Sequence, residues 1–283
     1  MSVELPSPLL WLLTLLLGLC LGSFMNVVIT RVPVMLMRRW RAEARAALEL
    51  PAEETSTFNL LTPSSMCPRC EYPITWRDKL PLVGYVLCRG RCAQCQTRIS
   101  PQYPLIELAG AGLTVAVVAI HGASLASLML IGVCLALLAL AVIDFRTQLL
   151  PDAITLPLLW AGLGYHLWFQ PLWLANAVIG AMAGYLVLWG FYWLFKLLTG
   201  KEGMGYGDFK LLAALGAWLG WPFLPLLLIL SAGLGAIIGL TMQFAMPRLR
   251  GMPIPFGPFL AMAGWIAILF DSHLMSLYQG LLL

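Results

Sequence analysis

Two apolar segments of the chain are joined by the stretch Gly203-Met204-Gly205-Tyr206-Gly207-Asp208-Phe209-Lys210. This stretch places an aspartate where a membrane helix is expected to begin. Its three glycines let the backbone adopt positive φ angles and let another segment approach closely. A charged group at membrane depth is costly and tends to mark a function. A helix that begins near Asp208 favours the ionised carboxylate through its free N–H groups and positive dipole end. Taken alone, however, the stretch fits a membrane loop with an N-capping aspartate better than a catalytic site.

The composition around this stretch is that of a membrane protein. Of the 283 residues, 60% are hydrophobic and only 11% are charged, and the mean hydropathy is +0.86. Soluble domains are about 25% charged. Many apolar runs approach or exceed the roughly 20 residues that a spanning helix needs. We therefore expect the lipid bilayer as a partner, and no nucleic acid.

The apolar runs predict an all-α polytopic membrane protein with about eight transmembrane helices. The first covers residues 9–29, and we interpret it as a retained helix because the flank before it holds Glu4 and no basic residue. The run is also too long for the apolar region of a signal peptide. The other spans are predicted at residues 105–120, 124–144, 154–169, 172–198, 209–220, 222–245 and 257–279. Because residues 209–220 are few for a span, the glycine stretch is expected to enter the membrane and to line a cavity.

The basic residues predict the orientation of these spans. Eleven of the 17 lysines and arginines lie in residues 31–98, and the others are Arg146, Lys196, Lys201, Lys210, Arg248 and Arg250. If the N-terminus is periplasmic and residues 31–98 are cytoplasmic, every lysine and arginine falls on the cytoplasmic side, as the positive-inside rule requires. The Arg38–Arg41 cluster is then an anchor to the inner leaflet, and residues 41–50 are expected to form a short amphipathic helix ended by Pro51.

Four cysteines in this polar segment predict a metal centre. They form two Cys-x2-Cys pairs, Cys67 with Cys70 and Cys92 with Cys95, separated by 21 residues. Two such pairs supply the four thiolates of a structural zinc site. A small loop domain with little core needs such a site in order to fold. Cys88 is interpreted as a free buried thiol.

We accordingly divide the chain into a first transmembrane helix at 1–33, a cytoplasmic four-cysteine zinc-binding domain at 34–101, and a membrane-embedded domain at 102–283.

A second aspartate ends the predicted third span. In the proposed orientation Asp144 and Asp208 both lie at the cytoplasmic edge of the bilayer, on different helices. Two carboxylates that face each other in a partly dry cleft indicate acid–base chemistry, although an isolated Asp144 would more often pair with Arg146 or cap a turn. Asp152 is expected to be the N-cap of the following helix. Glu107 is expected to have a structural partner.

Together these residues resemble a known family. Gly-x-Gly-Asp at 205–208 is similar to the signature of the membrane aspartic peptidases that include presenilin, and the whole set more closely resembles the bacterial type IV prepilin peptidases. The motifs that carry the resemblance are Gly22-Ser23-Phe24-Met25-Asn26-Val27-Val28-Ile29, the two Cys-x2-Cys pairs, Ile99-Ser100-x2-Tyr103-Pro104-Leu105-x-Glu107, Asp144-x5-Leu150-Pro151-Asp152, Gly205-Tyr206-Gly207-Asp208-Phe209-Lys210-Leu211 and Pro255-Phe256-Gly257-Pro258.

The resemblance implies a bifunctional enzyme of the bacterial inner membrane. Such an enzyme cleaves the basic leader from prepilins and type II secretion pseudopilins after a glycine, on the cytoplasmic side. It then methylates the new N-terminal residue, usually phenylalanine, with S-adenosylmethionine. By position, Asp144 and Asp208 would be the catalytic pair, while Gly205, Gly207 and Lys210 would lie at the substrate cleft. The chain has no glycine-rich βαβ unit, so a Rossmann-type cofactor site is not expected. The zinc loop is expected to form part of the methyl-transfer site or to position the substrate.

Three other functions remain open from the residues alone: a transporter that relays protons through the two aspartates, an assembly platform without enzymatic activity, and a peptidase that does not methylate. The sequence does not indicate the oligomeric state.

Overall fold

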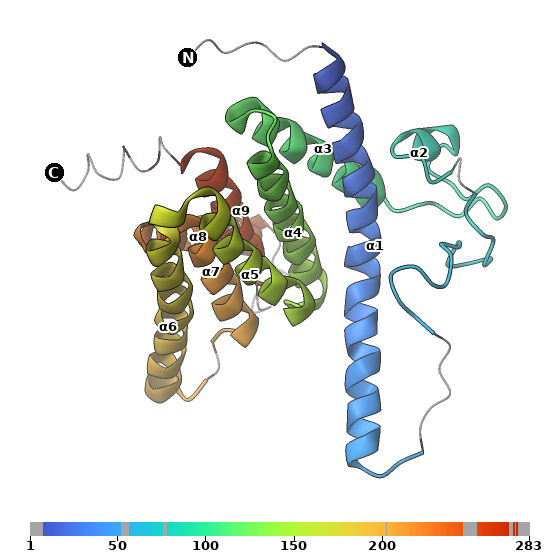
Figure 1. The fold of residues 1–283 in the computed structure, drawn as a ribbon. Coiled ribbons are helices and arrows are strands. Elements are labelled where there is room, and N and C mark those ends of the chain that lie inside the picture. Colours follow the sequence, from blue (N-terminus) through green and yellow to red (C-terminus); the bar gives the residue numbers. More distant parts are fainter. Residues whose placement is uncertain are drawn as a thin grey trace. The chain divides into compact units, whose positions relative to one another are not determined.

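The computed structural model describes residues 8–51, 57–75, 78–201, 203–245, 254–271, 274 and 276. Within these residues the regular secondary structure is helical, and extended pairing is limited to two isolated β-bridges (Figure 1). The predicted all-α class is therefore confirmed. The chain forms two compact units, Met1–Gly122 and Ala123–Leu283. Arg248 and Arg250, which contributed to the predicted orientation, lie outside the described residues.

The first unit contains α1 (Pro8–Ala47), α2 (Val83–Leu87) and α3 (Gln102–His121). We expected a membrane helix over residues 9–29 and a separate amphipathic helix over residues 41–50, but α1 is one continuous helix with Pro33 inside it. The predicted interruption is wrong. A proline removes one backbone hydrogen bond from a helix, and here the surrounding turns still form.

Small residues bring α1 and α3 together. A Cβ atom at Gly22 would lie 2.8 Å from Glu107 Cα, and one at Gly110 would lie 2.8 Å from Gly22 Cα. Such close approach of two helices is possible only without side chains at these positions. One turn further along α1, Asn26 Nδ2 donates a hydrogen bond to Tyr103 O at 3.0 Å. This contact links two membrane helices, as expected for a polar residue at that depth.

The second unit contains the remaining helices. They are α4 (Leu125–Thr147), α5 (Asp152–Phe169), the short η1 (Pro171–Trp173), α6 (Leu174–Thr199), α7 (Tyr206–Leu219), the short η2 (Trp221–Phe223), α8 (Leu224–Ala245) and α9 (Gly257–Leu269). A helix lies within every predicted span, but residues 272, 273, 275 and 277–279 of the last one lie outside the described residues. In the described part of the chain, five helical segments are long and apolar enough to cross a membrane. The predicted total of eight is therefore not confirmed, because α5, α7 and α9, with 18, 14 and 13 residues, are not among these five.

Helix α7 forms the core of the second unit. All of its residues from Leu211 to Leu219 are buried, and α5, α6 and α9 pack against it. A helix that is apolar all round is a core element, so a short α7 does not need to match the thickness of a bilayer. The approach of α6 is extreme: a Cβ at Gly216 would lie 2.2 Å from Gly180 O.

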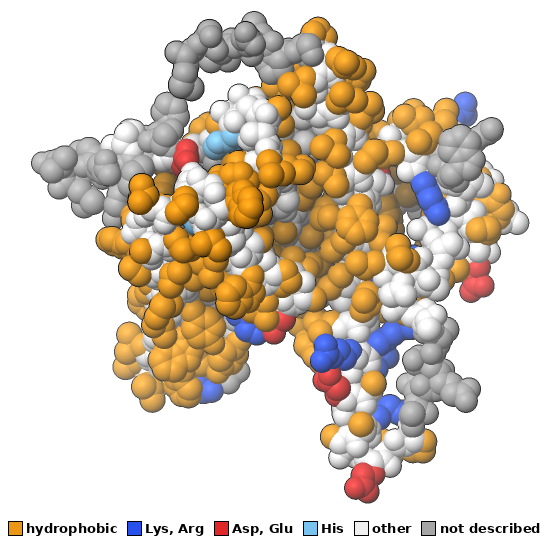
Figure 2. All heavy atoms as spheres, in the orientation of Figure 1, with side chains coloured by type: hydrophobic (Ala, Val, Ile, Leu, Met, Phe, Trp, Pro, Cys, Tyr) orange, Lys and Arg blue, Asp and Glu red, His pale blue; other side chains and the backbone are white. Residues whose placement is uncertain are grey.

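The outer face of α6 is suited to lipid. Its exposed side chains are large and apolar and include Ile179, Met182, Leu186, Phe191 and Leu194. Figure 2 shows hydrophobic side chains covering this helix, with basic groups only near its C-terminal end. The exposed apolar surface and the five long helices establish a multi-pass membrane protein.

Candidate active site and metal centre

The end of α4 places Asp144 at a buried position of the second unit. The residue is only 5% exposed, and its Oδ2 accepts a hydrogen bond from Gly257 N–H at 3.0 Å. Gly257 is the first residue of α9, so the carboxylate lies at the positive end of that helix dipole. A Cβ atom at Gly257 would lie 2.6 Å from Asp144 Oδ2, and therefore only glycine fits there. Gly257-Pro258 indicates a helix start in the sequence, but no local pattern indicates that Asp144 contacts it.

Asp208 enters the same unit from α7. It is the third residue of that helix and 7% exposed, and its own N–H donates to Gly205 O at 3.2 Å. The negative charge of Asp144 acts on the Asp208 carboxyl group, so the two lie within Coulombic range of each other.

Gly207 lets the start of α7 pack closely against the segment that follows α4. A Cβ atom there would lie 2.7 Å from Leu150 Cβ, in the segment that leads from α4 to α5. The first turn of α7 thus packs directly against the chain that follows Asp144.

Two buried carboxylates whose charges interact can act as a general acid and a general base. Like charges disfavour simultaneous ionisation, so the pair favours a state with one carboxylate and one carboxylic acid. A pair in that state offers a general base and a general acid at the same pH.

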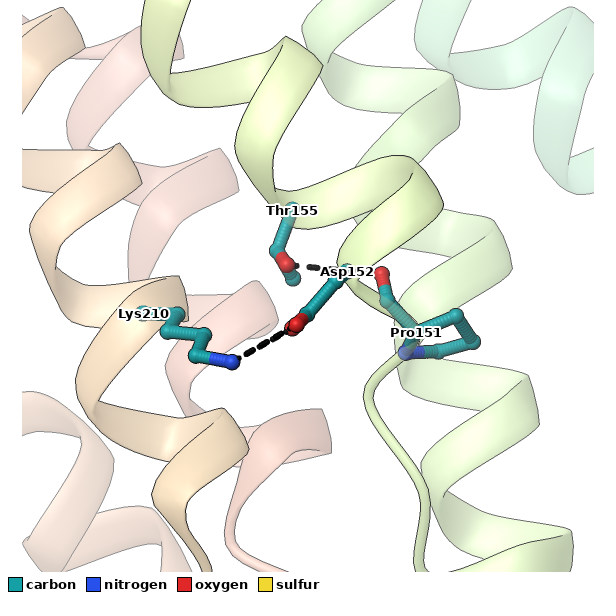
Figure 3. Close-up of polar contacts among 4 residues, drawn as sticks. All are labelled: Pro151, Asp152, Thr155 and Lys210. Carbon is teal, nitrogen blue, oxygen red and sulfur yellow. Dashed lines mark hydrogen bonds and ion pairs between the residues drawn. The ribbon is translucent and has the colours of Figure 1, made fainter. Parts of the chain in front are cut away.

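Lys210, two residues after Asp208 on α7, is held by an ion pair with α5. Its Nζ lies 2.7 and 2.8 Å from the two carboxylate oxygens of Asp152, and the side chains of Lys210 and Asp152 are 30% and 54% exposed. Figure 3 shows the two side chains pointing toward each other from α7 and α5. The prediction that Asp152 caps α5 is wrong: it is the first helical residue, Pro151 is the N-cap, and no side chain caps this helix. Thr155 Oγ1 donates to Pro151 O at 3.3 Å. Of the predicted cleft glycines, Gly205 is exposed and Gly207 is half-buried.

The four predicted metal ligands come together in the first unit. The Sγ atoms of Cys67, Cys70, Cys92 and Cys95 all lie within 4.8 Å of one another. Sγ–Sγ distances are 3.7 Å for Cys67 and Cys95 and 3.8 Å for Cys70 and Cys92. A tetrahedron with Zn–S bonds of about 2.3 Å has S–S edges of ~3.8 Å. The cluster therefore has the dimensions of a structural zinc site.

The two cysteine pairs lie on equivalent turns. Cys67 N–H donates to Tyr72 O at 3.0 Å, and Cys92 N–H donates to Thr97 O at 2.9 Å. An isolated β-bridge closes each turn. Hydrogen bonding by Thr97 lowers the pKa of Cys95 to about 6, which favours the thiolate that binds a metal ion.

Cys88 is not part of this cluster, in agreement with its interpretation as a free thiol, but it is half-buried and not buried as expected. Its Sγ donates a 3.4 Å hydrogen bond to Asp78 Oδ1, and burial raises the pKa of the thiol. Hydrogen bonding by Thr75 lowers the pKa of Asp78, so the carboxylate that accepts this bond is ionised at neutral pH.

Glu107 has the structural partner that we expected. Although it lies in α3, it is only 7% exposed, and its Oε2 accepts a hydrogen bond from Leu82 N–H at 2.8 Å. Leu82 precedes α2 and has a φ angle of 58°. The polar segment is thus tied to a membrane helix through one carboxylate.

Comparison with known families matches both parts of the chain. Residues 16–121 match the bacterial peptidase A24 N-terminal domain. Residues 130–240 match the type IV leader peptidase family, and this range includes both Asp144 and Asp208.

Curated relatives match over nearly the full length. A prepilin leader peptidase/N-methyltransferase of Aeromonas salmonicida strain A449 is 50% identical over 290 residues, which cover 99% of each chain. Proteins with the same description from Aeromonas hydrophila and Pseudomonas aeruginosa are 51% and 49% identical, covering 98% and 94% of this chain and 97% and 92% of theirs. No solved structure was found to match the chain.

Proposed function

We propose that Asp144 and Asp208 catalyse peptide cleavage in this protein. The chain belongs to the type IV leader peptidase family. It is a bifunctional enzyme that cleaves the leader peptide from prepilins and methylates the new N-terminus. The observation that supports the assignment of the two aspartates is their burial on separate helices, with the charge of Asp144 acting on the Asp208 carboxyl group. Both also lie in the part of the chain that matches the peptidase family.

The two aspartates would share the work of peptide hydrolysis. The ionised carboxylate takes a proton from water as the oxygen attacks the scissile carbonyl, and the protonated partner donates to the carbonyl oxygen. When the tetrahedral intermediate collapses, the C–N bond breaks and a proton passes to the leaving amine. The products are a carboxylate on the leader and a free amino group on the pilin. The exposed Gly205 leaves room for an extended substrate segment beside Asp208, whereas Gly207 is packed against Leu150. Lys210 lies further along the first turns of the same helix.

The residues of the first unit fit a structural zinc ion. Cys67, Cys70, Cys92 and Cys95 would hold it, and the ion would fix the two turns that carry them. When bound, S-adenosylmethionine supplies the methyl group for the second reaction. The described part of the chain has no βαβ unit, so its residues do not fit a Rossmann-type cradle for this cofactor. We place methyl transfer in the N-terminal part, with the zinc loop contributing to the site or positioning the substrate.

We further propose the setting in which these reactions occur. The enzyme lies in the bacterial inner membrane with a periplasmic N-terminus, and the zinc loop and the aspartates face the cytoplasm. The distribution of lysine and arginine supports this orientation. Substrates include pseudopilins as well as prepilins, and the methylated residue is usually phenylalanine. A division into residues 1–33, 34–101 and 102–283 separates the first helix, the zinc domain and the peptidase domain, although α1 continues past residue 33.

The proposal is tested by replacing each aspartate with its isosteric amide. Asp144→Asn and Asp208→Asn should each abolish cleavage of a purified prepilin, because either change removes one member of the acid–base pair. Glu43→Gln is the matched control, since it makes the same chemical change at an exposed surface pair with Arg39. Mass spectrometry of the pilin N-terminus measures cleavage and methylation together. Retained cleavage in either aspartate variant would remove that residue from the catalytic role.

A further inference from the structure

Glu107 is a buried carboxylate that peptide cleavage does not use. It is 7% exposed and lies in α3, one of the segments apolar enough to span a membrane. Burying an ionised carboxylate costs far more than burying a neutral amide. The hydrogen bond that it accepts, from Leu82 N–H at 2.8 Å, would be accepted equally well by the carbonyl oxygen of a glutamine. The anchor to the polar segment therefore requires an acceptor at this position, but it does not require a negative charge.

Asn26 provides a second buried acceptor, on the helix that packs against α3. Its Nδ2 donates to Tyr103 O at 3.0 Å, and since a carbonyl oxygen cannot donate, this bond fixes which way the amide is turned. Asn26 is 3% exposed, and among the described residues no donor lies within hydrogen-bond distance of its Oδ1. Buried amide oxygens almost always have a partner. This atom is therefore placed to accept a hydrogen bond from a donor outside the described chain.

The packing of α1 against α3 places Asn26 and Glu107 about one helical turn apart along the helix pair. Gly22 packs against Glu107, and Asn26, one turn further along α1, packs against Tyr103. The side chain of Glu107 is directed toward the N-terminus of its helix, as helical side chains are, and thus toward the level of Tyr103. The carboxylate and the free amide oxygen consequently both lie near the N-terminal end of α3, where the polar segment docks through Leu82.

We propose that Glu107 and Asn26 bind the α-ammonium group that cleavage creates on the processed pilin, and hold its nitrogen for methylation. An ammonium group has three N–H donors and a positive charge, which match a buried carboxylate and a neighbouring amide oxygen. An amine reacts as a nucleophile only after it loses a proton, and the carboxylate of Glu107 is the group in contact that can accept it. The nitrogen lone pair then forms the new N–C bond, while the C–S bond of the sulfonium methyl donor breaks and its electron pair stays on sulfur. This inference rests on the proposed function, because leader cleavage supplies the amino group.

Binding of two peptides tests the proposal without any methyl donor present. The probes are an unmethylated peptide with the N-terminal sequence of a mature pilin and the same peptide with an acetylated N-terminus, titrated into the detergent-solubilised enzyme. We expect the enzyme to bind the free amine about 10- to 100-fold more tightly than the acetylated form, the range expected for a charged hydrogen-bonded contact. In Glu107→Gln this preference should fall to about threefold or less, because the amide keeps the Leu82 bond and lacks the charge.

Two further measurements distinguish loss of the contact to the ammonium group from unfolding of the zinc loop. Glu107→Ala removes both the charge and the Leu82 anchor, so the zinc content of each variant shows whether the loop is still folded. Mass spectrometry of a processed pilin measures methylation, which the proposal expects Glu107→Gln to lose. Equal binding of the two peptides to the unmodified enzyme would overturn the proposal, as would an unchanged preference in Glu107→Gln. Since no turnover is needed in the titration, its outcome does not depend on whether Asp144 and Asp208 are correctly assigned.

Discussion

Gly216 makes the closest backbone contact in the core of the second unit, and Gly216→Ala tests whether α7 is as tightly packed as the structure indicates. A methyl group at this position would lie 2.2 Å from Gly180 O, whereas ordinary contacts begin at 3.4 Å. The neighbouring atoms belong to the α6 backbone and cannot rotate away, so α6 and α7 must separate by about 1 Å.

The expected magnitude follows from that displacement. Forcing extra volume into a packed core costs about 1–3 kcal/mol, partly because a gap of 0.5–1 Å forfeits a quarter to a half of each contact's dispersion energy. Gly190→Ala is the matched control in α6, because nothing lies within 4 Å of the added methyl group. Both variants gain roughly 0.5–1 kcal/mol from the change of glycine to alanine in a helix. The difference between them therefore isolates the cost of the clash.

Unfolding of the two variants in detergent micelles, followed by circular dichroism, measures this difference. We expect Gly216→Ala to be less stable than Gly190→Ala by about 1–3 kcal/mol. Because α7 also carries Asp208, a shift of about 1 Å should lower prepilin cleavage by as much as 10²-fold, whereas Gly190→Ala should retain it. Equal stability of the two variants would refute the close packing of α6 on α7.

Two further predictions concern the metal centre and the ion pair. Cys67→Ser should lose bound zinc, measured by atomic absorption, and should lower both enzymatic activities because the loop unfolds. Cys20→Ser is a matched change at an exposed cysteine and should retain the metal. Zinc retained by Cys67→Ser would contradict the site. Lys210→Ala and Asp152→Ala should each change the free energy of unfolding by only ~0.2–1 kcal/mol, because the pair is partly exposed. The double variant should have a free energy of unfolding no lower than that of the less stable single variant. An interaction free energy above about 2 kcal/mol in the double-mutant cycle would contradict this prediction, because it would show that solvent screens the pair far less than its exposure indicates.

Part of this description was available from the sequence because the relevant signals are local. Apolar runs indicated a helix at every predicted position, since a chain in lipid must satisfy its backbone hydrogen bonds within each segment. The spacing of the two Cys-x2-Cys pairs predicted the four-sulfur cluster, because each pair forms its own turn. Asp144 and Asp208 were conspicuous because charge is rare in apolar runs.

Other features depend on residues far apart in the chain, and there the sequence was insufficient or misleading. Pro33 is a local helix-breaking signal, yet α1 continues through it. Asp152 looked like a helix cap, but its carboxylate pairs with Lys210, 58 positions away. No local pattern linked Asp144 to Gly257 across 113 positions.

The sequence by itself thus determined which chemical groups this protein possesses and which segments are helical, because both follow from residue type and short-range periodicity. Only the tertiary structure decided which groups meet. Burial, hydrogen-bond partners and interacting charges arise when helices pack, and packing depends on the shapes of residues that the chain order keeps apart.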